Sequence, residues 1–370
     1  MLGLDGRGTI ASAVLIPTIV AYGGELGLPA ATGYLIGERK ADAGVVVGTA
    51  RSLALGFCPV LLVISVGLTL LLPIADAERG LALAFAAFVP LSLMQRVHLA
   101  ILQGGLRMRA FNAVRVVGGL AYVLALAVLP LLGAATTGGV IAALLVGNAV
   151  PAALAIGVGP RHRPLLAWDR AIAQRLLSYG ARGHLGTLSP IDSLRLDQLV
   201  LALFLPAQVL GLYVTAMTFV TANRVLGVSL GMVAFPVAAR TPAERARAPL
   251  LQLVGATLVL ATIAAVLEIA FGRPLLGFVF GREFLGAYAA LVVLAPASIA
   301  MNVRGVLADW LRGAGRPGIA TVGEVISLAV LIPTFALLWN GHVTGVSIAV
   351  LAASAVSLGA IVVLARGRAW

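Results

Sequence analysis

The sequence predicts an all-α, polytopic membrane helix bundle of about 11 transmembrane helices in two pseudo-repeated lobes. Three observations carry this prediction: the composition, a series of long apolar runs and an internal repeat. Of 370 residues, 61% are hydrophobic and 11% are charged, and the mean hydropathy is +1.06. A soluble domain is usually about half apolar and about a quarter charged. The chain is therefore expected to lie in a membrane.

Eleven apolar runs are long enough to cross a bilayer, which takes about 20 mostly apolar residues. The first run carries Gly27 and Pro29 close to its end, and a kink is expected there because proline lacks the backbone N–H that a helix needs. The runs lie near residues 9–36, 51–72, 81–101, 111–131, 138–158, 185–204, 211–236, 249–270, 286–304, 317–338 and 343–365.

Basic residues are concentrated in alternate loops. The loops with few basic residues contain only Arg7, Arg79, Arg273 and Arg282. The positive-inside rule places the other loops, which are rich in arginine, in the cytoplasm. With eleven spans, the N-terminus is then outside and the C-terminus cytoplasmic, in a multi-pass protein of the cell (inner) membrane. The net charge of +12 is thus mostly a topology signal, and nucleic acid is not expected as a partner.

Two loop segments repeat one pattern. LQGGLR at Leu102–Arg107 and LRGAGR at Leu311–Arg316 share L-x-G-x-x-R at an offset of 209 residues, which also relates Arg115 to Glu324. Repeated halves are typical of transporters. Since the second half has six spans and the first half five, the repeat predicts one more helix before Leu2. Arg115 and Glu324 are expected to make structural contacts.

The repeat divides the chain into an N-terminal lobe at 1–160 with five spans, a linker at 161–184 and a C-terminal lobe at 185–370 with six spans. The linker is basic and amphipathic, and we expect it to lie on the inner leaflet. Cys58 is the only cysteine, and the four histidines lack metal-ligand spacing. Neither a metal site nor a cofactor is predicted.

Three charges stand in the sixth run, PIDSLRLDQLVLALFLP. On a helix, Asp192 and Arg195 would share one face, and Asp197 would lie about 140° round from Asp192. A charge in the bilayer centre costs about 2.5–3.5 kcal/mol. Either these residues form an intrahelical pair with a hydrated Asp197, or the helix lines a cavity between the lobes.

Five segments resemble the polysaccharide-biosynthesis flippases, whose superfamily includes multidrug and toxin extrusion transporters and lipid II flippases. They are LGLDGRG, ILQGGLRMRAFN, LLSYGARGHLGTLSPIDSLRLDQLVLALFLPAQVLGLYVTAM, VAFPVAAR and WLRGAGRPGIA. The resemblance implies a bundle of twelve or fourteen helices that flips polyprenyl-diphosphate-linked oligosaccharide from the cytoplasmic to the outer leaflet. The sequence departs from the 12-helix flippase fold by lacking the first helix, and two explanations stay open: the start has been placed too late, or the chain is a degenerate copy. The resemblance also implies membrane lipids, polysaccharide polymerase and glycosyltransferases as partners.

The resemblance directs attention to Asp197, which falls on a recurring aspartate of the family. A polar stripe, Thr215, Thr218, Thr221 and Arg224, occupies the next helix at steps of three. A guanidinium and hydroxyls suit a diphosphate-linked sugar. Two interpretations of Arg224 stay open: it binds substrate, or it pairs with Glu25, the one acid of the first span.

Substrate binding is therefore assigned to Arg224, Thr221, Thr218 and Arg195, and gating or coupling to Asp197, Asp192 and Glu25. Arg96, near a helix end, is expected to extend to the membrane surface. No catalytic residue is predicted, because neither paired carboxylates nor a nucleophile with histidine lie on one membrane side. A drug/cation antiporter of the same superfamily and a non-transporting scaffold for glycosyltransferases remain alternatives.

Overall fold

The computed structural model describes residues 2–38, 41–71, 76–159, 166–184, 191, 194–314, 316–338 and 342–366. Within these ranges all regular secondary structure is helical, as the sequence predicts. The chain forms two compact units. Unit 1 comprises Met1–Leu2 and Thr9–Leu188, and unit 2 comprises Gly3–Gly8 and Ser189–Trp370. Helix α1 therefore begins in unit 2 and continues in unit 1.

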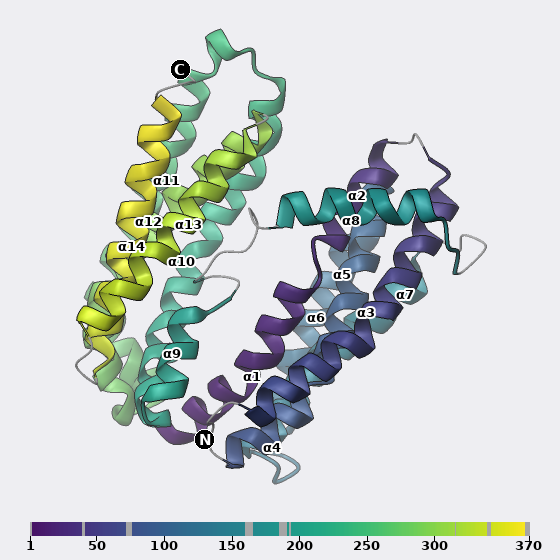
Figure 1. Ribbon diagram of the computed structural model, residues 1–370. Coiled ribbons are helices and arrows are strands. Elements are labelled where there is room, and N and C mark those ends of the chain that lie inside the picture. The colour runs from purple at the N-terminus through teal and green to yellow at the C-terminus, as the bar shows by residue number, and fades with distance from the viewer. Residues whose placement is uncertain are drawn as a thin grey trace. The chain divides into compact units, whose positions relative to one another are not determined.

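Unit 1 is a bundle in which α5 packs against α2, α3, α6 and α7, and α8 packs against α2 and α3 (Figure 1). Its helices are α1 (Leu4–Gly24), α2 (Leu28–Glu38), α3 (Ala43–Leu71), α4 (Asp76–Phe85), α5 (Phe88–Gly104), α6 (Met108–Val128), α7 (Thr137–Val158) and α8 (Arg170–His184).

Unit 2 is organised around α12, which packs against α10, α11, α13 and α14 (Figure 1). Its helices are α9 (Leu196–Phe204), α10 (Ala207–Arg240), α11 (Arg247–Leu275), α12 (Ala287–Gly313), α13 (Pro317–Leu337) and α14 (Val343–Arg366). Short turns of helix connect them at η1 (Ala243–Arg245), η2 (Leu276–Phe280) and η3 (Arg282–Gly286).

Ten helical stretches in the described ranges are long and apolar enough to cross a membrane. They match ten of the eleven predicted runs, and the chain is a multi-pass membrane protein. The exception is the run at 185–204, of which α9 covers only Leu196–Phe204. Nine helical residues rise about 13 Å, less than the bilayer hydrocarbon thickness of about 30 Å. Residues 185–190 and 192–193 of that run lie outside the described residues.

The internal repeat is confirmed in local geometry. Helix α5 ends at Gly104 and α12 at Gly313, while α6 covers 108–128 and α13 covers 317–337, so both junctions keep the offset of 209. The turns also share a hydrogen bond. The N–H of Arg107 donates to the carbonyl of Leu102 at 2.8 Å, and the N–H of Arg316 donates to that of Leu311 at 2.7 Å.

The kink expected near Gly27 is a complete helix break. Helix α1 ends at Gly24 and α2 starts at Leu28, and between them Leu26 (φ 48°) and Gly27 (φ 68°) are left-handed. Glycine adopts this conformation without a steric penalty. A Cβ on Gly27 would also lie 2.4 Å from the carbonyl oxygen of Gly180 in α8. The break and α8 are therefore in backbone contact.

The apolar side of the linker is buried inside unit 1 over part of its length. Ile172 (8% exposed) and Leu176 (0%) lie in α8, which packs against α2 and α3, whereas Leu166 and Trp168 are exposed. Asp169 accepts a hydrogen bond from the N–H of Ile172 and so caps the start of the helix. The position of the linker relative to the membrane stays a prediction.

Replacing Gly27 by alanine is expected to lower the free energy of unfolding by about 1–3 kcal/mol. The new methyl group would meet the Gly180 carbonyl, and alanine disfavours a φ of 68°. Thermal unfolding of the purified protein in detergent measures the change. Gly23→Ala is the control, because a Cβ there meets nothing within 4 Å. Equal melting temperatures for the two variants would contradict the tight contact.

Candidate functional site

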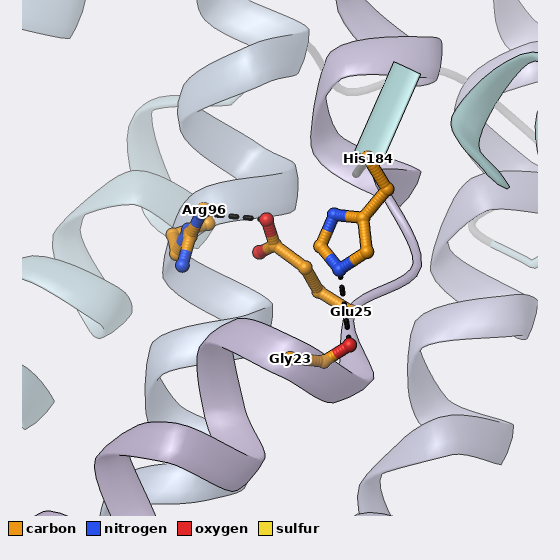
Figure 2. A network of polar contacts seen from close by, with 4 residues as sticks. All are labelled: Gly23, Glu25, Arg96 and His184. Carbon is orange, nitrogen blue, oxygen red and sulfur yellow. Dashed lines mark hydrogen bonds and ion pairs between the residues drawn. The ribbon is translucent and has the colours of Figure 1, made fainter. Parts of the chain in front are cut away.

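Glu25 lies in the break between α1 and α2 and is paired with Arg96 of α5. Arg96 Nη2 donates to Glu25 Oε1 at 2.6 Å, and the side chains are 29% and 7% exposed (Figure 2). The expectation that Arg96 extends to the membrane surface is therefore wrong. An acid in an apolar span needs a partner, and the cation of α5 supplies it.

Two further groups surround this pair. The guanidinium of Arg96 lies over the ring of Tyr22, 4.3 Å from its centroid. Nε2 of His184, the last residue of α8, lies 3.0 Å from the carbonyl oxygen of Gly23 (Figure 2). A carbonyl oxygen next to a helix break lacks its usual helical donor. Helices α1, α5 and α8 thus all contribute side chains or backbone groups to the same break.

The pair has unused hydrogen-bonding capacity. Among the described residues, neither the buried Oε2 of Glu25 nor the buried Nη1 of Arg96 has a hydrogen-bond partner. Buried polar atoms are rarely left unsatisfied. Oε2 could accept a proton or a hydroxyl donor, and Nη1 could donate to an anion.

Arg96 also faces a cavity of about 710 Å³ in unit 1. Residues of α2 and α5 supply most of the lining, with Tyr34 and Gln103 among the polar side chains. The Tyr34 ring stacks on Tyr179 of α8, with centroids 4.2 Å apart. Burial raises the pKa of Tyr179, and Tyr34 adds to the shift, so this phenol stays neutral at physiological pH. The volume lies in the range of small-molecule sites.

In unit 2, Asp197 is fully buried in the first turn of α9. Its Oδ2 accepts a hydrogen bond from the hydroxyl of Tyr213, in α10, at 2.5 Å. Arg195 precedes the helix and is left-handed (φ 47°, ψ 43°). Its expected placement on a helical face beside Asp192 is therefore wrong, and Asp192 lies outside the described residues.

The polar stripe of α10 is partly exposed. Thr215 is buried, Thr218 and Thr221 are exposed, and Arg224 is half-buried. The hydroxyl of Thr221 donates to the Met217 carbonyl at 2.8 Å, and that of Thr218 to the Val214 carbonyl at 3.0 Å. Thr218 also accepts a hydrogen bond from Arg7 at 2.8 Å. Arg7 belongs to the Gly3–Gly8 segment of unit 2.

A buried polar cluster that the sequence reading missed fixes the helix that carries Arg224. Asn223 Nδ2 donates to Ser298 Oγ at 2.9 Å, and Asn302 Nδ2 donates to Asn223 Oδ1 at 3.1 Å. Asn302 Oδ1 accepts from the N–H of Gly227 at 3.0 Å. Asparagines in apolar spans were the available signal, because buried amides require partners. Arg224 therefore lies on α10 at the point where these hydrogen bonds join it to α12.

The structure also shows the partners of two further acids, Glu324 and Glu25. Glu324 contacts Arg304 at 2.6 Å, which agrees with a structural role. Inside unit 1 the partner of Glu25 is Arg96. A pair between Glu25 and Arg224 would join the two units, and it stays a prediction.

A family model described as polysaccharide biosynthesis protein matches residues 2–289. The chain belongs to the polysaccharide biosynthesis protein family. The match covers unit 1 from Leu2 onward, the Asp197–Tyr213 pair, the α10 stripe, all of η3 and the start of α12. Compared with curated protein sequences, this member of the family has no significant match.

The chain has the fold of the MOP superfamily of membrane transporters. It is similar to an inward-facing multidrug resistance MATE transporter (TM-score 0.81, 15% identity, 99% of this chain and 91% of that chain). It is similar to the lipid II flippase MurJ in an inward closed conformation (TM-score 0.77, 11% identity, 99% of this chain and 82% of that chain). It also resembles a Pyrococcus furiosus MOP superfamily transporter whose binding pocket is described as reversed in polarity (TM-score 0.67, 14% identity, 98% of this chain and 87% of that chain).

Proposed function

We propose that this polysaccharide biosynthesis protein flips polyprenyl-diphosphate-linked oligosaccharide from the cytoplasmic to the outer leaflet, for surface polysaccharide synthesis. The observation that carries the proposal is Arg96, a cation held by Glu25 and Tyr22 at the wall of an open pocket between α2 and α5 of unit 1. A diphosphate needs a fixed cation, and guanidinium offers two parallel donors to phosphate oxygens. The family match and the likeness to a lipid II flippase support the same substrate class.

In this proposal each unit contributes its own polar groups. Arg96 in unit 1 and Arg224 in unit 2 bind the diphosphate, with Arg195 as a further cation, while the hydroxyls of Thr218 and Thr221 bind sugar. Glu25, Asp192 and Asp197 gate or couple transport. The units alternate access by rocking against each other. The Arg-rich loops are cytoplasmic, the membrane is the inner membrane, and polymerase and glycosyltransferases are functional partners.

A drug/cation antiporter is the competing function, since a multidrug transporter has the same fold. An organic cation would be repelled by an arginine that faces the cavity, unless Glu25 outweighed it. Arg96 and Glu25 neutralise each other, but only Arg96 lines the cavity, so a guanidinium and not a carboxylate faces the substrate. The charge of the cavity wall thus favours an anionic substrate over a cationic one.

Transport by the purified protein in proteoliposomes tests the proposal. A polyprenyl diphosphate bearing a fluorescent disaccharide is placed in both leaflets, and a membrane-impermeant quencher reports how much label reaches the outer surface. We expect nearly complete quenching with the protein and about half without it. Ethidium efflux driven by a proton or sodium gradient is measured on the same vesicles.

The outcomes separate the three functions. Lipid flipping without ethidium efflux supports the flippase. Ethidium efflux without flipping identifies an antiporter. Neither activity, in a protein that is correctly folded by thermal unfolding, favours the non-transporting scaffold.

A further inference from the structure

An apolar groove of about 810 Å³ runs along unit 2 between α11 and α14, over α12. Its floor includes the buried Leu250, Val303 and Leu307, and its rim includes Leu251 and Leu258, which are 56% and 48% exposed. The only lining residue that is not apolar, among those described, is Arg247. The functional sites of Glu25 and Arg224 share no residue with this groove.

The groove has the length of one membrane leaflet. Its lining runs from Arg247 to Leu258 on α11, from Pro296 to Leu307 on α12 and from Leu351 to Val362 on α14. Each interval advances eleven residues, or about 16 Å at 1.5 Å per residue. Half of the bilayer hydrocarbon thickness is about 15 Å. Leu250, Leu307 and Ala365 belong to one core cluster, so the start of α11 lies beside the ends of α12 and α14.

The open end of the groove is suited to an anion. Arg247 is exposed and is the first residue of α11. The preceding Ala246 has no side-chain hydrogen bond to cap the helix. The helix dipole favours a negative charge at this position. Arg245 adds a second exposed cation and Glu244 one exposed anion, so the end keeps a net positive charge.

We infer that the groove binds an anionic diacyl phospholipid from the leaflet at which α11 begins. The acyl chains fill the space between α11 and α14, and the phosphate meets Arg247 and the N-terminus of α11. A leaflet-length groove suits acyl chains better than a polyprenyl chain, which is longer than one leaflet. Because the positive-inside rule places Arg247 in the cytoplasm, the lipid comes from the inner leaflet. The inference does not depend on the transported substrate.

Lipid titration of the full-length protein in detergent, followed by native mass spectrometry, tests the inference. The probes are dioleoyl phosphatidylglycerol, dioleoyl phosphatidylcholine and undecaprenyl phosphate. Arg247→Gln should weaken phosphatidylglycerol binding about fivefold and leave phosphatidylcholine unchanged, since one cation near a lipid surface contributes roughly that factor. Ala355→Trp, at an exposed lining position, should weaken both phospholipids at least as strongly by filling the groove.

Two variants outside the groove are matched controls. Arg109→Gln removes an exposed arginine at the start of α6, and Gly119→Trp adds an indole to α6 where a Cβ meets nothing within 4 Å. Both should bind lipid as the unchanged protein does. The inference fails if Arg247→Gln and Ala355→Trp retain full phosphatidylglycerol affinity, or if the controls lose as much. Tighter binding of undecaprenyl phosphate that Ala355→Trp removes would overturn the choice of occupant.

Discussion

Arg96→Ala is expected to abolish lipid flipping and to lower the free energy of unfolding by about 3 kcal/mol. The substitution leaves the Glu25 carboxylate, 7% exposed, without its cation. Removing one member of a buried pair typically costs about 3–5 kcal/mol, and the partial exposure of Arg96 places the loss at the lower end. Thermal unfolding in detergent and the proteoliposome assay measure the two effects.

A double-mutant cycle separates the structural role of Arg96 from substrate binding. Glu25→Gln combined with Arg96→Gln removes both charges and keeps amides that can bond each other. Stability should then recover relative to either single variant. Because Glu25 is itself assigned to gating, the readout is binding of the labelled lipid substrate and not flipping. If Arg96 binds the diphosphate, substrate binding stays lost in the stable double variant; if Arg96 only holds Glu25, substrate binding returns with stability.

An exposed arginine of unit 1, Arg109, provides the control for this cycle. Arg109→Gln lies in unit 1 but outside the cavity lining, and it should leave flipping and unfolding unchanged. Normal flipping in Arg96→Ala would exclude Arg96 as a substrate ligand. In that case the role of Arg96 would be limited to its ion pair with Glu25.

The helix break was predictable from the sequence, whereas the partner of Glu25 was not. Gly27 and Pro29 are local signals, because they restrict the backbone at their own positions. Pairing of Glu25 depends on how α5 is rotated and shifted against the break, and hydropathy contains no such information. Arg96 stands near the end of an apolar run, where extension to the surface was the simpler reading. Glu25 itself was the better signal, because a lone acid in a span requires a cation nearby.

The prediction for the charges before α9 is wrong for a related reason. A continuous apolar run predicts a continuous helix, but Arg195 is left-handed and α9 begins at Leu196. The spacing of Asp192 and Arg195 then says nothing about a shared face. Asp197 and Tyr213, by contrast, both stood in the segment that resembles the family, and they are hydrogen-bonded. The motif thus contains both residues without indicating their contact.

Amphipathicity likewise left the environment of α8 open. The pattern of Ile172 and Leu176 predicts an apolar face but does not say whether lipid or protein covers it. In unit 1, α2 and α3 cover these two residues, and Gly180 contacts Gly27 directly. Small residues that permit this backbone approach are visible in the sequence only after the partner helix is known.

Arg224→Ala is expected to abolish outer-leaflet exposure of the lipid-linked oligosaccharide and to leave the protein folded. Arg224 is half-buried, and the hydrogen bonds of Asn223 and Asn302 beside it hold α10 against α12. Arg224→Lys should recover only part of the activity, since an ammonium keeps the charge but not the forked donor geometry. Arg273→Ala, an exposed arginine in the last turn of α11, is the matched control and should flip normally.

Two further variants decide what Arg224 does. If it braces the units through Glu25, then Glu25→Ala should be as damaging as Arg224→Ala, and the double variant should be milder than either. If Arg224 binds the diphosphate, the double variant stays inactive. Asp197→Asn should impair flipping while labelled substrate still binds, because it alters the buried hydrogen bond with Tyr213 and leaves Arg224 in place. Substrate binding measured beside flipping distinguishes these cases, and normal flipping in Arg224→Ala would exclude it as a phosphate ligand.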